Sequence, residues 1–290
     1  MGEKNKNPMI RRSFSSSYFS LPHFSLRSRL MPIQVRTATC RLDQFVFGKI
    51  AYDVMQCVFD IHNEFGRFLD EKIYKRELGR RFPGTELEVP IELRFESFHK
   101  LYFLDVLVGG GAVFEFKAVE SLTDRHWSQL LHYLMMADLS HGKLVNTRTE
   151  QVQHEFVNTT LRPGDRTRFE VIDHGWQEIG DKPILEWCMA FLRDIGTGLG
   201  TNLYEEALTH HLGGEERVLQ DIEIISGKTV LGSQKFRLVA PGVAFKVTAS
   251  SAAPRMFESH ARRLLEHTRL DAIQWINITL NEVSFRTIRR

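Results

Sequence analysis

Residues 101–120 read LYFLDVLVGGGAVFEFKAVE, and this stretch decides the fold. Two runs rich in Val, Leu and Phe flank three consecutive glycines, a pattern that predicts a β-hairpin turning at Gly109, Gly110 and Gly111. If the turn is symmetric about Gly110, Asp105 lies directly across the hairpin from Glu115, since each is five residues from the centre. The predicted hairpin therefore brings two carboxylates together.

Two facing carboxylates destabilise a sheet, because cross-strand neighbours have Cβ atoms about 4.5–5.5 Å apart and like charges repel. A bound divalent cation would remove this repulsion. The two-residue period of a strand places Lys117 on the same face as Glu115, whereas Phe114 and Phe116 point to the opposite, packing face. The alternative is a solvated sheet whose outer face carries Asp, Glu and Lys without a shared function. The short D…ExK pattern alone leaves both interpretations open.

The composition is that of an ordinary globular protein, with 42% hydrophobic and 26% charged residues. At 290 residues the chain is long enough for two domains, each with its own core. A net charge of +2 neither requires nor excludes nucleic acid, since binding depends on a local basic surface. Three widely separated cysteines, Cys40, Cys57 and Cys188, lack metal-ligand spacing and indicate reduced thiols in a cytoplasmic location. No run approaches the roughly 18 apolar residues of a membrane span, so no membrane partner is expected.

Residues 1–40 have a composition of their own. They are rich in Arg and Ser and contain no acidic residue after Glu3. Such a bias is compatible with an organellar transit peptide, but we favour a disordered extension or an upstream start codon with Met31 as the natural beginning. We exclude this segment from the predicted fold.

From residue 43 the pattern predicts a regular series of elements. Apolar residues at helical spacing predict a helix from Asp43 to Gly66, and further helices are expected over 69–80 and 121–138. Strands are predicted over 86–95, where Pro90 suggests an edge or a bulge, on both sides of the glycine turn, and over 143–146 and 154–158. The order helix, helix, strand, hairpin, helix, strand, strand predicts an α/β fold with a mixed central sheet flanked by helices.

After a polar linker at 163–182, the residue pattern of the first half begins again. One constant shift without a gap aligns the first-half positions Gly66, Leu69, Tyr74 and Leu78 with Gly196, Leu199, Tyr204 and Leu208. With small length changes, the alignment continues with Phe116 and Lys117 on Phe245 and Lys246, Leu130 and Leu131 on Leu264 and Leu265, and Asn146 on Asn277. We therefore predict a domain at 41–162 and a tandem copy at 183–290. Two unrelated domains with common apolar spacing are the alternative.

The second copy is degenerate at the positions of interest. In this alignment Thr201 stands where the first copy has Glu71, Arg237 lies near the place of Asp105, and Ala244 stands for Glu115, so that only Lys246 remains. The second half is expected to dock on the first, to complete a groove, or to bind a protein partner or a second copy of the chain.

These motifs resemble a known family. Gly66, Glu71 and Tyr74, followed by EVP, LDVLV, FEFKAVE, QLLHYL and KLVNT, are similar to the GxxExxY proteins, a branch of the PD-(D/E)XK nuclease superfamily. The resemblance covers roughly residues 45–160 and, more loosely, 184–288. It implies a restriction-endonuclease-like core, in agreement with the predicted order of elements.

The resemblance also implies roles for individual residues. Asp105 corresponds to the metal-binding Asp of the superfamily, and Glu115 and Lys117 to its (D/E)XK pair. Glu71 is similar to the additional carboxylate that many members contribute, and Gln129 and Tyr133 match a QxxxY motif that borders the site. Leu104 replaces the usual Pro, and Phe103 stands where relatives often have Arg, which bears on substrate contacts more than on metal binding.

Two functions follow as hypotheses. In the first, Asp105, Glu115 and Glu71 bind Mg²⁺, or Mn²⁺, because hard oxygen ligands suit these ions. Lys117 then assists hydrolysis of a phosphodiester bond in DNA, or in RNA, by orienting or deprotonating the metal-bound water or by stabilising the transition state. In the second, the chain is a catalytically inactive binding or scaffold protein that keeps the nuclease fold, in line with the decay of the second copy.

Overall fold

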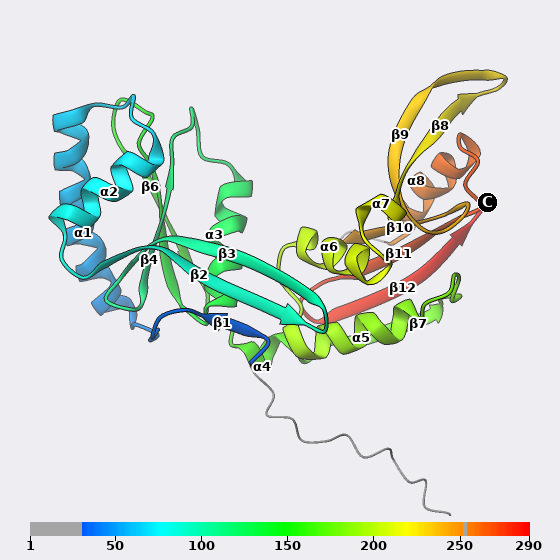
Figure 1. The fold of residues 1–290 in the computed structure, drawn as a ribbon, viewed down its shortest axis with the longest axis horizontal. Coiled ribbons are helices and arrows are strands. Elements are labelled where there is room, and N and C mark those ends of the chain that lie inside the picture. Colours follow the sequence, from blue (N-terminus) through cyan, green and yellow to red (C-terminus); the bar gives the residue numbers. More distant parts are fainter. Residues whose placement is uncertain (1–30, 252–253) are drawn as a thin grey trace, which may run out of the picture. The chain divides into compact units, whose positions relative to one another are not determined.

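The computed structural model describes residues 31–251 and 254–290 and contains two mixed sheets with their helices (Figure 1). The expectations for residues 1–30 lie outside the described residues. Residues 31–40, in contrast, differ from the prediction that excluded them. Ile33–Val35 form strand β1, which pairs antiparallel with strand β2 (Thr85–Phe95), and Arg36 forms an ion pair with Glu92 of that strand. Three residues are too few for a periodic pattern, so this strand left no signal in the sequence.

The first sheet is mixed, as predicted. Its strand order is β1-β2-β3-β4-β5-β6, in which β4 and β5 are parallel and every other neighbouring pair is antiparallel. The remaining strands are β3 (Phe98–Val108), β4 (Ala112–Lys117), β5 (His141–Asn146) and β6 (Gln153–Asn158).

The hairpin predicted around Gly110 is confirmed. β3 and β4 pair with Val108 opposite Ala112 and Val106 opposite Phe114, which is the register of a turn centred on Gly110. Gly111 has no room for a side chain, because a Cβ atom there would lie 2.4 Å from the carbonyl oxygen of Cys40. The segment that precedes the first helix therefore packs directly on this turn.

Three helices cover the first sheet. Helix α1 (Gln44–Phe65) begins at Asp43, whose side chain accepts a hydrogen bond from the Val46 amide, and ends at Gly66. With α2 (Glu71–Arg81) it packs on the sheet face that carries Phe114 and Phe116, both fully buried as predicted. Helix α3 (Asp124–Met136) packs on the opposite face.

The second sheet has the strand order β7-β12-β11-β10-β9-β8. Its strands are β7 (Glu170–Gly175), β8 (Leu219–Ser226), β9 (Thr229–Ala240), β10 (Val243–Thr248), β11 (Ala272–Ile278) and β12 (Glu282–Arg289). The helices of this half are α5 (Ile184–Ile195), α6 (Thr201–His211), α7 (Glu215–Val218) and α8 (Pro254–Glu266).

Residues 163–182, for which the sequence suggests a linker, contain two regular elements. Helix α4 (Pro163–Arg166) is short, and β7 pairs parallel with β12 at the edge of the second sheet. The register is irregular near Gly175. β7 is exposed along most of its length, which explains its polar composition.

The two halves repeat one topology. From β2 to β6 and from β8 to β12 the strands follow in the same order, and β10 and β11 are the parallel pair of the second half. The Tyr74 hydroxyl donates to the Gly66 carbonyl, and Tyr204 donates to Gly196 at 2.9 Å. These hydrogen bonds connect α2 to the end of α1 and α6 to the end of α5.

Besides a core within each half, the described residues form a hydrophobic core that joins the halves. It extends from the α3 face of the first sheet to α5, α6 and one face of the second sheet. Phe95 and Phe191 meet edge to face with ring centroids 5.1 Å apart, and Trp187 Nε1 donates to Glu96 at 3.0 Å.

Candidate active site

The site begins at the open end of the β3–β4 hairpin. The paired residues of β3 and β4 end at Val106 and Phe114, and Asp105 and Glu115 are the next residue of each strand beyond this last pair. Asp105 Oδ2 accepts a hydrogen bond of 2.9 Å from the backbone amide of Phe116. A side-chain carboxylate thus replaces a main-chain acceptor at this point.

Strand β2 contributes an unusual backbone conformation on the other side of Asp105. Glu88 lies between the pairs Leu87–Val106 and Val89–Leu104, at the position that faces Asp105. Its φ is +52°, which few residues other than glycine adopt. Such conformations concentrate at functional sites, where the surrounding structure stabilises them.

Each strand carboxylate is paired with an amine. Lys117 Nζ lies 2.7 Å from Glu115 Oε1, which confirms that both side chains are on one face. Lys75, from α2, lies 2.7 Å from Asp105 Oδ1 and also pairs with Glu88. Glu71, one helical turn before Lys75, accepts a hydrogen bond of 2.9 Å from the Ala118 amide just beyond β4. Helix α2 thus contacts Asp105 on β3 through Lys75 and the end of β4 through Glu71.

Glu115 is in an electrostatically unfavourable position. It is 2% exposed, and burial, followed by the negative charge of Asp105, raises its pKa to about 7. Lys117 offsets only part of this effect. Within the described residues, Glu115 Oε2 is buried and has no hydrogen-bond partner. The cluster therefore has one buried carboxylate oxygen available for a positively charged ligand.

Lys117 is a cation at neutral pH. Burial alone would lower its pKa, but the charge of Glu115 and the hydrogen bond to it outweigh burial, and the pKa is raised. A protonated lysine donates hydrogen bonds and stabilises negative charge.

Helix α3 borders the cluster. Gln129 Nε2 donates to the Tyr133 hydroxyl at 2.9 Å. Burial raises the pKa of Tyr133, the hydrogen bond from Gln129 and the charge of Lys117 lower it, and the charges of Glu115 and Asp105 raise it further. Both side chains line a cavity of about 510 Å³ together with Tyr102 and Arg125. The predicted QxxxY pair thus lies beside the candidate site.

The chemistry of the donor set fits a hard divalent cation, since Asp105, Glu115 and Glu71 are all carboxylates. The orphaned Oε2 of Glu115 is an observation in favour of such an ion. In the part of the chain that the structure describes, however, no group of three or more His, Cys, Asp or Glu side chains has a metal-binding arrangement. The three metal ligands therefore stay a prediction.

Sequence reasoning missed Lys75 and Glu88. Lys75 carried a detectable signal, because it lies four residues after Glu71 and so shares its helix face. Glu88 carried none, since its position depends on a backbone conformation that the strand pattern does not reveal.

The strand registers differ from one predicted correspondence in the second half. Lys117 pairs with Asn146 in the parallel ladder, and Thr248 pairs with Asn277. The two asparagines make the same contacts, because Asn146 exchanges hydrogen bonds with the backbone of Val119 and Asn277 does so with Ser250. This register places Lys246 at the position of Glu115 and Thr248 at that of Lys117. Matching of apolar residues alone aligns Lys117 with Lys246. The strand registers align Lys117 with Thr248 instead, which is two residues, or one strand period, further along.

Comparison with known proteins finds a match for one segment of the chain. No curated protein matches the chain, and no solved structure matches it. A family model matches less than half of the chain, over the segment from α1 to β6 that contains every candidate site residue. That segment, residues 48–158, matches the PD-(D/E)XK nuclease superfamily.

Proposed function

We propose that the domain at 41–162 is a Mg²⁺-dependent nuclease, with Mn²⁺ as an alternative cofactor, that hydrolyses phosphodiester bonds in DNA, with RNA as an alternative substrate. The observation that carries this proposal is the convergence of Asp105, Glu115 and Lys117 on one hairpin, inside the segment that matches the nuclease superfamily. A buried, partnerless carboxylate oxygen and a neighbouring cation are the complementary parts of a phosphate-hydrolysing site.

Asp105, Glu115 and Glu71 would hold the metal ion. When bound, a divalent ion lowers the pKa of a water molecule and withdraws electron density from the phosphate. Lys117 contributes a fixed positive charge near the phosphate oxygens, where negative charge increases in the transition state. Lys75 positions Asp105 through the contact of 2.7 Å. Gln129 and Tyr133 border the space in which the substrate would lie.

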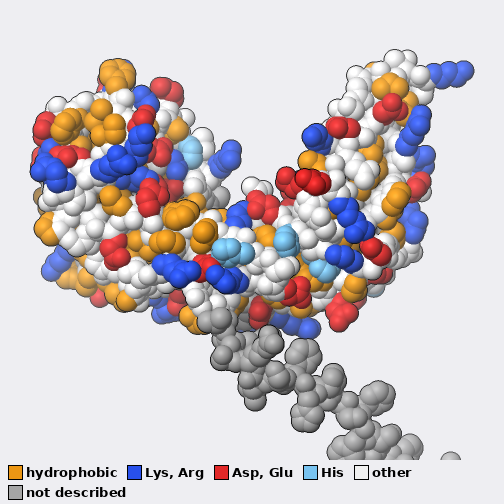
Figure 2. All heavy atoms as spheres, viewed as in Figure 1, with side chains coloured by type: hydrophobic (Ala, Val, Ile, Leu, Met, Phe, Trp, Pro, Cys, Tyr) orange, Lys and Arg blue, Asp and Glu red, His pale blue; other side chains and the backbone are white. Residues whose placement is uncertain are grey.

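A second candidate function is a catalytically inactive binding or scaffold protein. It is favoured by the ion pairs of Asp105 and Glu115 with Lys75 and Lys117, which satisfy most of the charge without a metal ion. On the face shown in Figure 2, Lys and Arg side chains are interspersed with Asp and Glu. Nucleic-acid binding would therefore depend on local clusters of Lys and Arg side chains.

Calorimetric titration of Mn²⁺ into the wild type and Asp105→Ala separates the two functions. The nuclease proposal expects metal uptake that is lost in the variant, whereas uptake by neither protein supports the scaffold.

Labelled duplex DNA, single-stranded DNA and RNA are then incubated with Mg²⁺ or Mn²⁺. Lys117→Met should reduce cleavage by about 100-fold or more. Lys228→Met, an equal change of charge in the exposed β8–β9 turn, should cleave like the wild type. Cleavage that survives in Lys117→Met would refute the assignment.

The finer assignments belong to the same proposal. We place the first half in the GxxExxY branch, on the resemblance of its motifs. We interpret residues 183–290 as a degenerate tandem copy that binds a protein partner or a second chain, and the common strand order and the Gly–Tyr hydrogen bonds support the duplication.

We also propose a cytoplasmic location. All three cysteines are free thiols, as a reducing compartment would maintain them. None of the described helices is both long enough and apolar enough to cross a membrane.

A further inference from the structure

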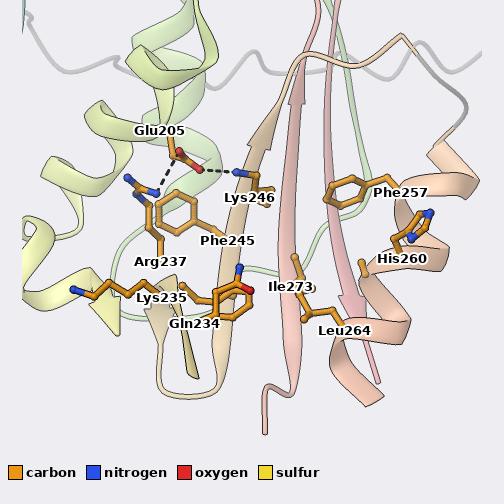
Figure 3. Close-up of a pocket in the computed structure, with 13 residues that line it drawn as sticks. Glu205, Gln234, Lys235, Arg237, Phe245, Lys246, Phe257, His260, Leu264 and Ile273 are labelled. Carbon is orange, nitrogen blue, oxygen red and sulfur yellow. Dashed lines mark hydrogen bonds and ion pairs between the residues drawn. The ribbon is translucent and has the colours of Figure 1, made fainter. Parts of the chain in front are cut away.

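The second sheet has a cavity at the place that corresponds to the candidate active site. It has a volume of about 330 Å³ and lies against β9, β10 and β11 and beside α8 (Figure 3). Its apolar lining includes Phe236, Phe257, Leu264 and Ile273. The Phe257 ring stacks on Trp275 with centroids 4.1 Å apart and planes inclined by 18°, so this part of the wall is fixed.

The polar lining is predominantly cationic. Lys235, Arg237 and Lys246 line the cavity, and Glu205 from α6 is the acidic residue among the lining side chains. Glu205 is shared, with Arg237 Nη1 at 3.4 Å and Lys246 Nζ at 3.3 Å (Figure 3). Two cations against one carboxylate leave a charge of +1 among Arg237, Lys246 and Glu205. One carboxylate cannot satisfy the donors of two cationic side chains.

Arg237 shows this shortage directly. Its Nε is buried and, among the described residues, has no hydrogen-bond partner. A buried donor without a partner is costly, and a guanidinium presents its N–H groups in a planar fork that matches two phosphate oxygens. An anion placed beside Arg237 and Lys246 would accept from both side chains.

The charges are reversed relative to the first half. The constant shift that aligns Tyr74 with Tyr204 places Glu205 at the position of Lys75. By strand register, Lys246 replaces Glu115. The first site has carboxylates that need a cation, and the second has cations that need an anion.

We propose that this cavity binds a nucleotide, with its phosphate at Arg237 and Lys246 and its base against Phe236 and Phe257. The volume is at the lower end of the range of about 300–1,000 Å³ for small-ligand pockets. Arg and Lys suit phosphate, and aromatic side chains stack on any base. The nucleotide is either free or part of a nucleic-acid strand. This binding goes beyond the proposed hydrolysis and does not depend on it.

Isothermal titration calorimetry of the full chain in EDTA tests the proposal without hydrolysis. The probes are inorganic phosphate, adenosine and guanosine 5′-monophosphates, and a short single-stranded oligodeoxynucleotide. We expect the mononucleotides to bind more tightly than inorganic phosphate. A further gain for the oligonucleotide identifies a strand as the source, and equal affinity identifies a free nucleotide.

Three variants locate the binding. Arg237→Gln and Lys246→Met should each weaken nucleotide binding by about tenfold or more, because each removes a charge-assisted contact with the phosphate. Glu205→Gln should strengthen binding, since it removes the competing carboxylate. Lys228→Met is the control of equal charge change, and thermal unfolding checks the fold of every variant.

The proposal is overturned if no probe binds at millimolar concentration. It is also overturned if Arg237→Gln and Lys246→Met, folded like the wild type, bind as tightly as Lys228→Met. Because EDTA excludes a divalent ion, failure here leaves the hydrolysis at Asp105 and Glu115 untouched, and failure of cleavage leaves this binding site untouched.

Discussion

His132 should make the protein sensitive to acid. The side chain is in α3, where Nδ1 accepts a hydrogen bond of 3.0 Å from the Gly200 amide at the start of α6. Burial, with smaller contributions from Lys100 and Arg166, lowers its pKa from 6.5 to about 3. The folded protein therefore keeps His132 neutral, whereas the unfolded chain binds a proton below pH 6.5. Stability that is present above pH 6.5 is lost as the pH falls towards 3.

The size of the effect follows from the pKa difference. About 3.5 pKa units correspond to about 5 kcal/mol in the free energy of unfolding, of which about 2 kcal/mol is lost by pH 5. His132→Asn removes the titration and retains an oxygen acceptor near the Nδ1 position for Gly200. His174→Asn, in the exposed strand β7, is the matched control.

Urea denaturation of the three proteins at pH 7 and pH 5 measures this difference. Between the two values, the wild type and His174→Asn should lose about 2 kcal/mol more stability than His132→Asn. If wild type and His132→Asn instead lose equal stability, His132 is not held neutral by burial and the reasoning is wrong.

Three further perturbations have defined outcomes in the same denaturation assay. Gly111→Ala should destabilise the folded protein by about 1–3 kcal/mol, because the new Cβ atom meets the Cys40 carbonyl. Gly48→Ala, at an exposed helix position with open space around it, should stabilise the protein by about 0.5–1 kcal/mol. Equal effects of the two substitutions would contradict this reasoning. Tyr74→Phe and Tyr204→Phe should each lower the free energy of unfolding by about 1–3 kcal/mol, since each leaves a glycine carbonyl without its hydrogen-bond donor. A loss of stability for only one of the two variants would show that the two contacts are not equivalent. In EDTA, raising the pH from 4.5 to 7 should lower the free energy of unfolding of the wild type by about 3 kcal/mol more than that of Glu115→Gln. The reason is that ionisation of Glu115 is disfavoured only in the folded state. Parallel pH profiles of the two proteins would exclude this.

The features predicted from the sequence are those with a local cause. The glycine turn determines the register of its own hairpin, and the cap at Asp43 and the helical spacing that follows determine α1. Asp105, Glu115 and Lys117 were therefore found together, because they lie on two strands joined by a short turn. Gln129 and Tyr133 lie on one side of a predicted helix, and the resemblance to the QxxxY motif identified them as site residues.

The features that were missed depend on distant contacts. β1 and β7 are edge strands whose partners lie far along the chain, and neither has an apolar pattern of its own. The match of Lys246 with Glu115 in strand register emerged only from the contacts of Asn146 and Asn277. Matching of apolar residues tolerates a shift by two positions along a strand, since the same face stays buried.

The common core has a consequence for dissecting the protein. Because residues of α3, α5 and both sheets bury one another, cutting the chain near residue 162 would expose apolar surface on both fragments. Such fragments would tend to aggregate, and the intact chain should melt in a single cooperative transition. Loss of activity on truncation would then reflect the removal of residues that pack in the shared core. Point substitutions are better suited to assign the chemistry to either half.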